Sequence, residues 1–289
     1  MWIADGWNDY EVIDTSNGEK LERWGEYRLV RPDPQVIWNT KRDDRLWRKK
    51  NGHYHRSKKG GGEWEFFDLP KKWQIHYRNL TFNLQPFSFK HTGLFPEQAV
   101  NWDWFSSLIK ERTEKGLETK VLNLFAYTGG ATIAAAAAGA KVTHVDASKG
   151  MVNWAKENAA DSGLKDAPIR WLVDDCVKFV EREIRRGNVY DAIIMDPPSY
   201  GRGPKGEIWK IEEQIYPFIQ LCMNILSEKP LFFLVNSYTT GLQPAVLKYM
   251  INLELVPRFG GKVEAEEIGL PVTSKQLVLP CGASGRWCR

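Results

Sequence analysis

The chain has 289 residues, a length that allows one large domain or two modest ones. Its hydrophobic fraction of 43% and charged fraction of 26% are those of an ordinary globular protein, and the net charge of +4 decides little. No apolar run reaches the roughly 18–20 residues of a membrane span, and the N-terminus lacks a secretory signal pattern. The four cysteines show no paired spacing, so we expect reduced thiols in a cytoplasmic protein.

Residues 1–85 show no helical periodicity and predict a small β-rich domain. Short alternating stretches such as 10–14 and 73–77 are bounded by Gly, Asn and Pro turn residues. Pro32 and Pro34 cannot lie inside a central strand, because proline has no N–H for the ladder. Residues 80–93 are expected to form a bridge into a second domain that spans 86–289.

The segment from Lys41 to Lys59 is strongly basic. It holds nine cations against two acids, and Trp47, His53, Tyr54 and His55 stand among them. Cations interleaved with rings suit a phosphate backbone and unstacked bases, so this stretch predicts RNA contact through Arg48, Lys49 and Lys50. A solvated hairpin with a Gly-rich tip at 58–62 is an equal alternative. None of the five histidines has a partner at metal-ligand spacing, and we expect no metal site.

From residue 97 onward helical and strand-like stretches alternate. Residues 97–115 read as a helix that Gly116 ends. Apolar strands are then expected at 121–125, 141–145, 169–173, 191–195 and 231–235, with helices between them at 131–138, 150–162, 176–186 and 207–226. This alternation predicts an α/β fold, Rossmann-like, with a mainly parallel sheet and helices on both faces. Residues 265–268 and 276–279 fit an antiparallel pair that closes one edge.

The segment 123–130, Asn-Leu-Phe-Ala-Tyr-Thr-Gly-Gly, leaves a buried strand and enters a helix. Its glycines let the backbone approach a ligand where a Cβ would clash, and the helix N-terminus offers unpaired N–H donors to a carboxylate or a phosphate. The spacing is not Gly-x-Gly-x-x-Gly, so a nicotinamide dinucleotide fold is the weaker reading.

Acidic residues follow the next two strands. Asp146 can accept both hydroxyls of a ribose, and Ser148 can cap the helix that follows. At Asp175-Cys176 a carboxylate can accept from an adenine amino group while a backbone N–H meets a ring nitrogen. Three consecutive strand ends at the carboxyl edge of one sheet together favour an adenosine-containing ligand.

The most specific motif is Asp196-Pro197-Pro198-Ser199-Tyr200, at the end of the fourth strand. Two prolines fix the turn, which exposes a carboxylate, proline carbonyls and an aromatic ring. The carboxylate and a carbonyl can orient the lone pair of an amino nitrogen toward a methyl donor, and Tyr200 can stack on a base. We assign catalysis to Asp196, Pro197, Pro198 and Tyr200. Arg202 and Lys205, on the loop that follows, are expected to meet phosphates.

These segments, in this order, resemble class I S-adenosylmethionine-dependent methyltransferases over roughly residues 92–289. The resemblance is to the large-subunit ribosomal RNA group, relatives of the cytosine-C5 and guanine-N7 enzymes. It implies S-adenosylmethionine as cofactor, and the segment 91–98 adds Phe95 and Gln98 to its binding residues. The expected cofactor-binding set is then Phe95, Gln98, Asn123, Phe125, Tyr127, Thr128, Gly129, Gly130, Asp146, Ser148, Asp175, Cys176 and Asp196.

One departure from that group concerns the nucleophile. The stretch after the fifth strand, Asn236-Ser237-Tyr238, has no cysteine, and Ser199 follows the prolines. Covalent activation of a pyrimidine is therefore disfavoured, and a nitrogen of an RNA base is the expected acceptor, with Asn236 as a substrate contact. A small-molecule or protein substrate, and a non-catalytic RNA-binding role, stay open as alternatives.

Overall fold

A computed structural model describes residues 1–57, 61–87, 89–202 and 208–289. The chain packs into two compact units. The C-terminal unit comprises residues 101–268 and 282–289 with Met1, and the N-terminal unit comprises residues 2–100 and 269–281. Strands β16 (Lys262–Val272) and β17 (Leu277–Cys288) each contribute residues to both units.

The C-terminal unit is built on a sheet with the strand order β11-β10-β9-β12-β15-β17-β16. Five of its strands are β9 (Lys120–Leu124), β10 (Lys141–Asp146), β11 (Ile169–Val173), β12 (Ala192–Met195) and β15 (Phe232–Ser237). These five strands pair in parallel, and β17 is antiparallel to β15. The predicted α/β Rossmann-like fold with an antiparallel C-terminal edge is confirmed.

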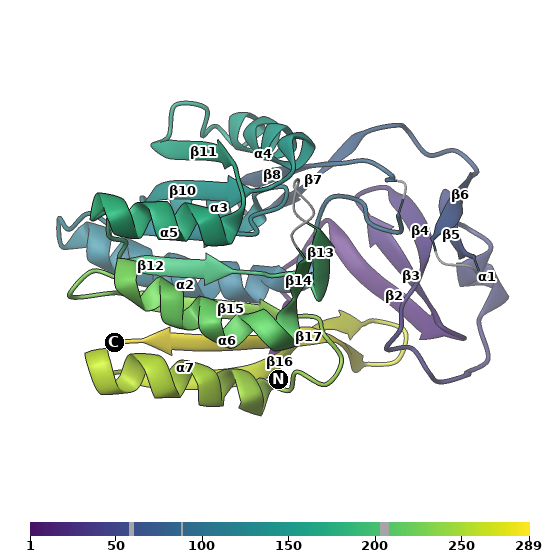
Figure 1. Cartoon of the computed structure of the whole chain (residues 1–289). Helices are drawn as coiled ribbons and strands as arrows, with labels where there is room; N and C mark the ends of the chain where they lie inside the picture. The colour runs from purple at the N-terminus through teal and green to yellow at the C-terminus, as the bar shows by residue number, and fades with distance from the viewer. Residues whose placement is uncertain (58–60, 88, 203–207) are drawn as a thin grey trace. The chain divides into compact units, whose positions relative to one another are not determined.

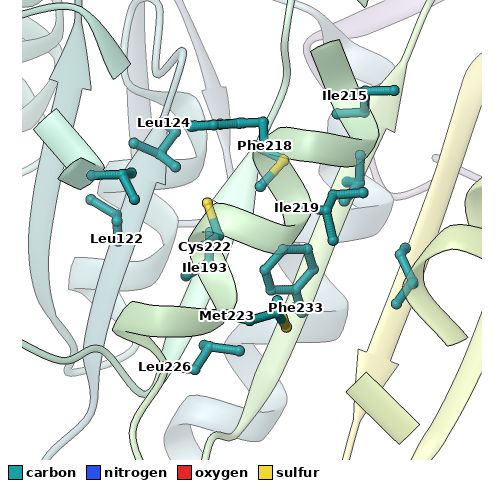
Figure 2. Close-up of a cluster of buried hydrophobic side chains, with 14 of the residues drawn as sticks. Leu122, Leu124, Ile193, Ile215, Phe218, Ile219, Cys222, Met223, Leu226 and Phe233 are labelled. Atoms are coloured by element: carbon teal, nitrogen blue, oxygen red, sulfur yellow. The ribbon is translucent and has the colours of Figure 1, made fainter. Parts of the chain in front are cut away.

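Helices cover both faces of this sheet (Figure 1). On one face lie α5 (Cys176–Arg186), α6 (Ile211–Cys222) and α7 (Pro244–Phe259), and on the other α2 (Ala99–Glu114), α3 (Gly130–Ala137) and α4 (Lys149–Asp161). Figure 2 shows the core on the first face, where Phe218, Ile219 and Met223 pack on Ile193 and Phe233 of the sheet. Burying these side chains stabilises the strand positions, at about 1.5–3 kcal/mol for each large residue.

Three expectations for this part of the chain need correction. The predicted helix 207–226 begins only at Ile211, because residues 208–210 form β14, which pairs with β13 (Tyr200–Arg202), and η2 (Met223–Ile225) follows the helix. Helix α7 was missed, although Pro244 occupies its first turn as prolines commonly do. The C-terminal strands are longer than predicted, and Pro271 lies within β16 instead of in a turn.

The N-terminal unit is β-rich, as predicted. An antiparallel meander of β2 (Tyr10–Ser16), β3 (Glu19–Trp24) and β4 (Tyr27–Pro32) is followed by the short helix α1 (Asp44–Trp47) and the hairpin of β5 (Gly52–Arg56) and β6 (Gly62–Phe66). The two-residue strand β1 (Trp2–Ile3) precedes the meander. Residues 80–93 are not purely a bridge, since β8 (Leu80–Leu84) pairs with β7 (Trp73–Tyr77).

The interior of this unit holds a buried ion group. Arg31 donates two hydrogen bonds to the carboxylate of Glu22, at 2.6 and 2.8 Å, and Tyr10 donates a third. Lys20 lies 3.5 Å from the same carboxylate and 3.2 Å from Asp33. Each charge in the group therefore has an opposite charge or a hydrogen-bonding partner, which buried charges require.

Candidate active site

The carboxyl ends of three central strands meet at one edge of the C-terminal sheet. Ala126 N–H donates to the Val145 carbonyl at 3.1 Å, and Asp196 N–H donates to the Leu124 carbonyl at 3.4 Å. On the other side of β10, Asp174 N–H donates to the Asp146 carbonyl at 3.0 Å. The structure therefore brings together the strand ends that carry the predicted site residues.

The turn between β9 and α3 has an uncommon backbone. Phe125 and Tyr127 adopt φ values of 54° and 50°, in the left-handed region that bulky residues rarely occupy. Hydrogen bonds hold both positions: Phe125 N–H donates to the Cys176 sulfur at 3.3 Å, and Tyr127 N–H donates to the Asp146 carboxylate at 2.8 Å. Strained residues that neighbouring groups fix in place are characteristic of ligand-binding turns.

The two glycines of this turn lie very close to other protein atoms. Gly129 has φ 83°, and a Cβ there would lie 2.8 Å from the Cβ of Ala155. A Cβ on Gly130 would lie 2.8 Å from the ring of Trp102. The glycines therefore let α3 pack against protein atoms, and the close approach of a ligand to this turn stays a prediction. Helix α3 has no side-chain cap, which leaves its N-terminal donors to a ligand.

Buried polar side chains hold the turn between β9 and α3 in place. Asn123 donates to the Thr132 hydroxyl at 2.9 Å, and that hydroxyl lies 2.9 Å from Nδ1 of His144. Burial lowers the pKa of His144 to about 3, so its ring is neutral at physiological pH. The Thr128 carbonyl accepts a hydrogen bond from Asn158 at 2.9 Å. Asn123 and Thr128, both buried, thus fix the loop rather than line a surface.

Asp146 has spare capacity for a ligand. Its two carboxylate oxygens accept one backbone N–H each, from Tyr127 and from Ser148, at 2.8 Å. A carboxylate can accept about four hydrogen bonds, and the residue is only partly buried, so two ribose hydroxyls can still bind. Burial raises the pKa of Asp146, and the two N–H donors oppose that shift. Ser148 caps α4 as predicted, accepting from Met151 N–H at 3.4 Å.

At the third strand end, the predicted site residue Asp175 also has a structural contact. The Asp175 side chain caps α5, accepting from Lys178 N–H at 2.9 Å, and Asp174 forms an ion pair with Arg182. One oxygen of Asp175 therefore has a structural role, and the other could meet an adenine amino group. Burial raises the pKa of the Cys176 thiol well above its ordinary value, so this sulfur is a neutral acceptor for the Phe125 N–H.

The Asp196–Tyr200 turn lies next to this cluster and presents fewer free groups than its sequence indicates. The Pro198 carbonyl accepts a hydrogen bond from the indole of Trp209 at 2.7 Å, and the Ser199 carbonyl accepts from Ile211 N–H at 3.1 Å. The Ser199 hydroxyl lies 2.6 Å from that of Thr239. The carboxylate of Asp196 and the carbonyl of Pro197 are further acceptor groups of this turn. Tyr200 is exposed, and its ring offers a flat surface on which a base can stack.

Trp209 is a site residue that the sequence did not reveal. Its ring lies 5.1 Å from that of Phe125 and 5.8 Å from that of Phe218, while its N–H holds the Asp196–Tyr200 turn. It therefore contacts both the turn after β9, through Phe125, and the Asp196–Tyr200 turn, through Pro198. The signal was hidden because residues 208–210 were predicted as helix, whereas they form β14 opposite Tyr200.

The residues predicted to bind substrate differ in how the structure places them. Asn236 is buried, and its carboxamide oxygen accepts from Asn101 at 3.1 Å and from Ser284 at 2.7 Å, which favours a structural role. Arg48 and Lys49 stand in solvent, and the ammonium of Lys50 lies 5.4 Å from the ring centroid of Phe67. The side chain of Arg202 and all of Lys205 lie outside the described residues.

Phe95 and Gln98 belong to the N-terminal unit. Phe95 precedes the short helix η1 (Pro96–Gln98), and its ring lies 5.2 Å from that of His91. Gln98 is buried at the end of η1. Their contact with a cofactor remains a prediction.

The expectation that no histidine has a partner at metal-ligand spacing is wrong for His53 and His55. His53 and His55 share a face of β5, and together with Glu65 of β6 their ligand atoms lie within 4.8 Å of one another. The sequence hid this group because Glu65 is brought there only by hairpin pairing.

The sheet order, the turn after β9 and the acids at the strand ends define a class I methyltransferase architecture. A family model described as S-adenosylmethionine-dependent methyltransferase matches residues 44–212. A crystal structure of a SAM-dependent methyltransferase from Agrobacterium tumefaciens is 37% identical with a TM-score of 0.91, over 99% of this chain and 92% of that one. The chain belongs to the S-adenosylmethionine-dependent methyltransferase family.

Two further comparisons are more limited. A ribosomal RNA large subunit methyltransferase K/L from Pseudoalteromonas atlantica is 34% identical over 157 residues, 53% of this chain and 21% of that protein. This chain thus spans about a fifth of the length of the curated relatives it matches. A SAM-dependent methyltransferase structure from Streptococcus mutans is 18% identical with a TM-score of 0.75, covers 99% of this chain and 76% of that one, and shows the fold alone.

The family and the site agree on the cofactor. S-adenosylmethionine carries an amino acid carboxylate, a ribose and an adenine, and the uncapped α3 N-terminus and the spare acceptor positions of Asp146 suit the first two. Within the described residues, no helix is both long and apolar enough to cross a membrane.

Proposed function

We propose that this enzyme methylates a nitrogen of a base in RNA, in particular ribosomal RNA, and that it does so in the cytoplasm. The observation that carries the proposal is the Asp196–Pro197 turn at the end of β12. Its carboxylate and its Pro197 carbonyl are acceptors suited to an amino or ring N–H, and they adjoin the β9 turn through the hydrogen bond from Asp196 N–H to the Leu124 carbonyl.

In this mechanism the protein works by orientation. When bound, the cofactor supplies an electrophilic methyl group on a sulfonium. Asp196 and Pro197 accept hydrogen bonds from the substrate nitrogen and so direct its lone pair at that methyl carbon. A nitrogen that gains the methyl group would carry a surplus proton, which Asp196 or water would accept. Holding two reactants in line in this way accelerates transfer without a covalent enzyme intermediate.

The thiols of the chain support a nitrogen acceptor over a covalent pyrimidine mechanism. Neither the Asp196–Tyr200 turn nor Asn236-Ser237-Tyr238 contains a cysteine. Burial raises the pKa of Cys222 and of Cys176 above the ordinary thiol value, which removes both as thiolate nucleophiles.

Support for RNA comes from two sides. The N-terminal unit carries an exposed basic segment around Arg48 and Lys49, and relatives that match about half of this chain are named as ribosomal RNA methyltransferases. Both points concern the substrate class and leave the nucleotide open.

The test is methyl transfer from labelled S-adenosylmethionine to ribosomal RNA taken from cells that lack the protein. We expect label in RNA nucleosides with the wild type. Asp196→Ala should lower the rate by about a hundredfold or more while binding of S-adenosylhomocysteine changes only a few fold. Asp166→Ala, an exposed loop acid, is the matched control. Full activity of Asp196→Ala would refute the assigned role, and label found only in protein or small molecules would refute the RNA substrate.

A further inference from the structure

The β5–β6 hairpin of the N-terminal unit carries a side-chain group that methyl transfer does not use. His53 and His55 are two residues apart on β5, so their side chains lie on one face of the strand. Glu65 of β6 is paired with His53 in the register of the hairpin, which places it on that same face. One nitrogen of each imidazole and one oxygen of Glu65 lie within 4.8 Å of one another.

The contacts within this group are close. Nε2 of His55 lies 2.8 Å from a carboxylate oxygen of Glu65, and the two imidazole rings have centroids 3.9 Å apart. Ligand atoms around a tetrahedral zinc ion with bonds of about 2.1 Å are about 3.4 Å apart. Small side-chain rotations therefore suffice to bring the three ligand atoms to one ion.

Polar contacts around His53 resemble those of a metal-bound histidine. Nε2 of His53 lies 2.6 Å from Oε1 of Glu19, and Oε2 of Glu19 accepts a hydrogen bond from Arg42 at 2.8 Å. Metal-binding imidazoles commonly donate their second N–H to a carboxylate, which fixes the tautomer and the ring orientation. With Nε2 committed to Glu19, Nδ1 is the nitrogen of His53 that can bind an ion.

We propose that His53, His55 and Glu65 form a binding site for a transition-metal dication of the zinc class, with Glu19 orienting His53. Two imidazoles and one carboxylate suit Zn²⁺ and disfavour Mg²⁺ and Ca²⁺, which take oxygen ligands. The side chains of His55 and Glu65 are about half exposed, at 48% and 52%, so an ion reaches the site from solvent and keeps water in its remaining position.

The test is titration of chelator-treated, tag-free full-length protein with Zn²⁺ by calorimetry and with Co²⁺ by visible absorption. We expect one equivalent to bind with micromolar or tighter affinity. His55→Gln and Glu65→Gln should each weaken binding at least tenfold, and Glu19→Gln by about 10–100-fold through loss of the orienting carboxylate. Circular dichroism and thermal unfolding show that each variant is folded.

His76→Gln provides the matched control, because Nδ1 of His76 lies 3.0 Å from the exposed carboxylate of Asp9 without belonging to a three-ligand group among the described residues. Unchanged binding in this variant supports the site. Absence of one-to-one binding in the wild type overturns the proposal, as does an equal loss in His76→Gln and His55→Gln, which would show adventitious binding to surface histidines.

Discussion

The edge of the C-terminal sheet and the basic segment of the N-terminal unit hold their functional groups in opposite ways. At the sheet edge, backbone donors fix the Asp146 carboxylate, and the Trp209 indole fixes the Pro198 carbonyl. In the basic segment, the side chain of Arg48 is 81% exposed and forms a 3.5 Å ion pair with Asp44. The first arrangement can orient a reaction, whereas the second can attract a polyanion without fixing its position.

The first prediction concerns the stability of the N-terminal unit. Glu22→Gln should lower the free energy of unfolding by about 3–5 kcal/mol, because it leaves the buried charge of Arg31 without its carboxylate and removes one of the two carboxylates near Lys20. Calorimetric melting of the variant measures the loss.

Acid should act through the same residue. Burial alone would raise the pKa of Glu22, but attraction to Arg31 and Lys20 outweighs it and lowers the pKa to about 2. This stability is therefore present above the ordinary glutamic acid pKa and is lost as pH falls toward 2. The exposed pair of Glu111 and Lys115 supplies the control, and equal melting of Glu111→Gln and Glu22→Gln would contradict the account.

The second prediction concerns the cofactor. Asp146→Ala removes the acceptors for a ribose together with the support of Tyr127 N–H, so the affinity for S-adenosylhomocysteine should fall by about 1.5–3 kcal/mol, roughly 10- to 150-fold. Isothermal calorimetry measures it, with Asp166→Ala as control. Unaltered affinity would remove Asp146 from the cofactor site.

The third prediction concerns the basic segment. Replacing Arg48, Lys49 and Lys50 with serine should weaken RNA binding about tenfold and flatten its salt dependence, because fewer counterions are released. Binding of S-adenosylhomocysteine should not change. Filter binding over a series of salt concentrations gives the slope, and a slope equal to that of the wild type would show that this segment does not touch RNA.

The smallest expected effect belongs to Trp209→Phe. The ring stays to pack on Phe125, but the hydrogen bond to the Pro198 carbonyl is lost, so we expect kcat to fall a few fold with little change in cofactor affinity. Single-turnover transfer assays detect this. An equal loss in Trp154→Phe, on α4, would show a general packing effect instead.

The sequence predicted the C-terminal unit well because its signals are local. Strand and helix periodicity, Gly116 at a helix end and the proline turn after β12 each act within a few residues, and all five parallel strands lie where expected. The acids at the strand ends could be placed together because parallel strands end at one edge.

What the sequence could not show depends on long-range pairing. The bond from Trp209 to Pro198 needs the β13–β14 hairpin, and Glu65 reaches His55 only through the register of β5 and β6. Asn236 was predicted to touch substrate, yet its partners Asn101 and Ser284 are distant in sequence and bury it. The contacts of a side chain whose partners are distant in sequence can be identified only once the fold is known.

The central claim is that the Asp196 turn presents a nitrogen of an RNA base to the methyl donor. Mass spectrometry of ribosomal RNA nucleosides tests it most directly, in cells that lack this protein and in the same cells supplied with the wild type or with Asp196→Ala. We expect that one N-methylated nucleoside disappears, returns with the wild type and stays absent with Asp196→Ala. An unchanged nucleoside profile, or restoration by Asp196→Ala, would contradict it.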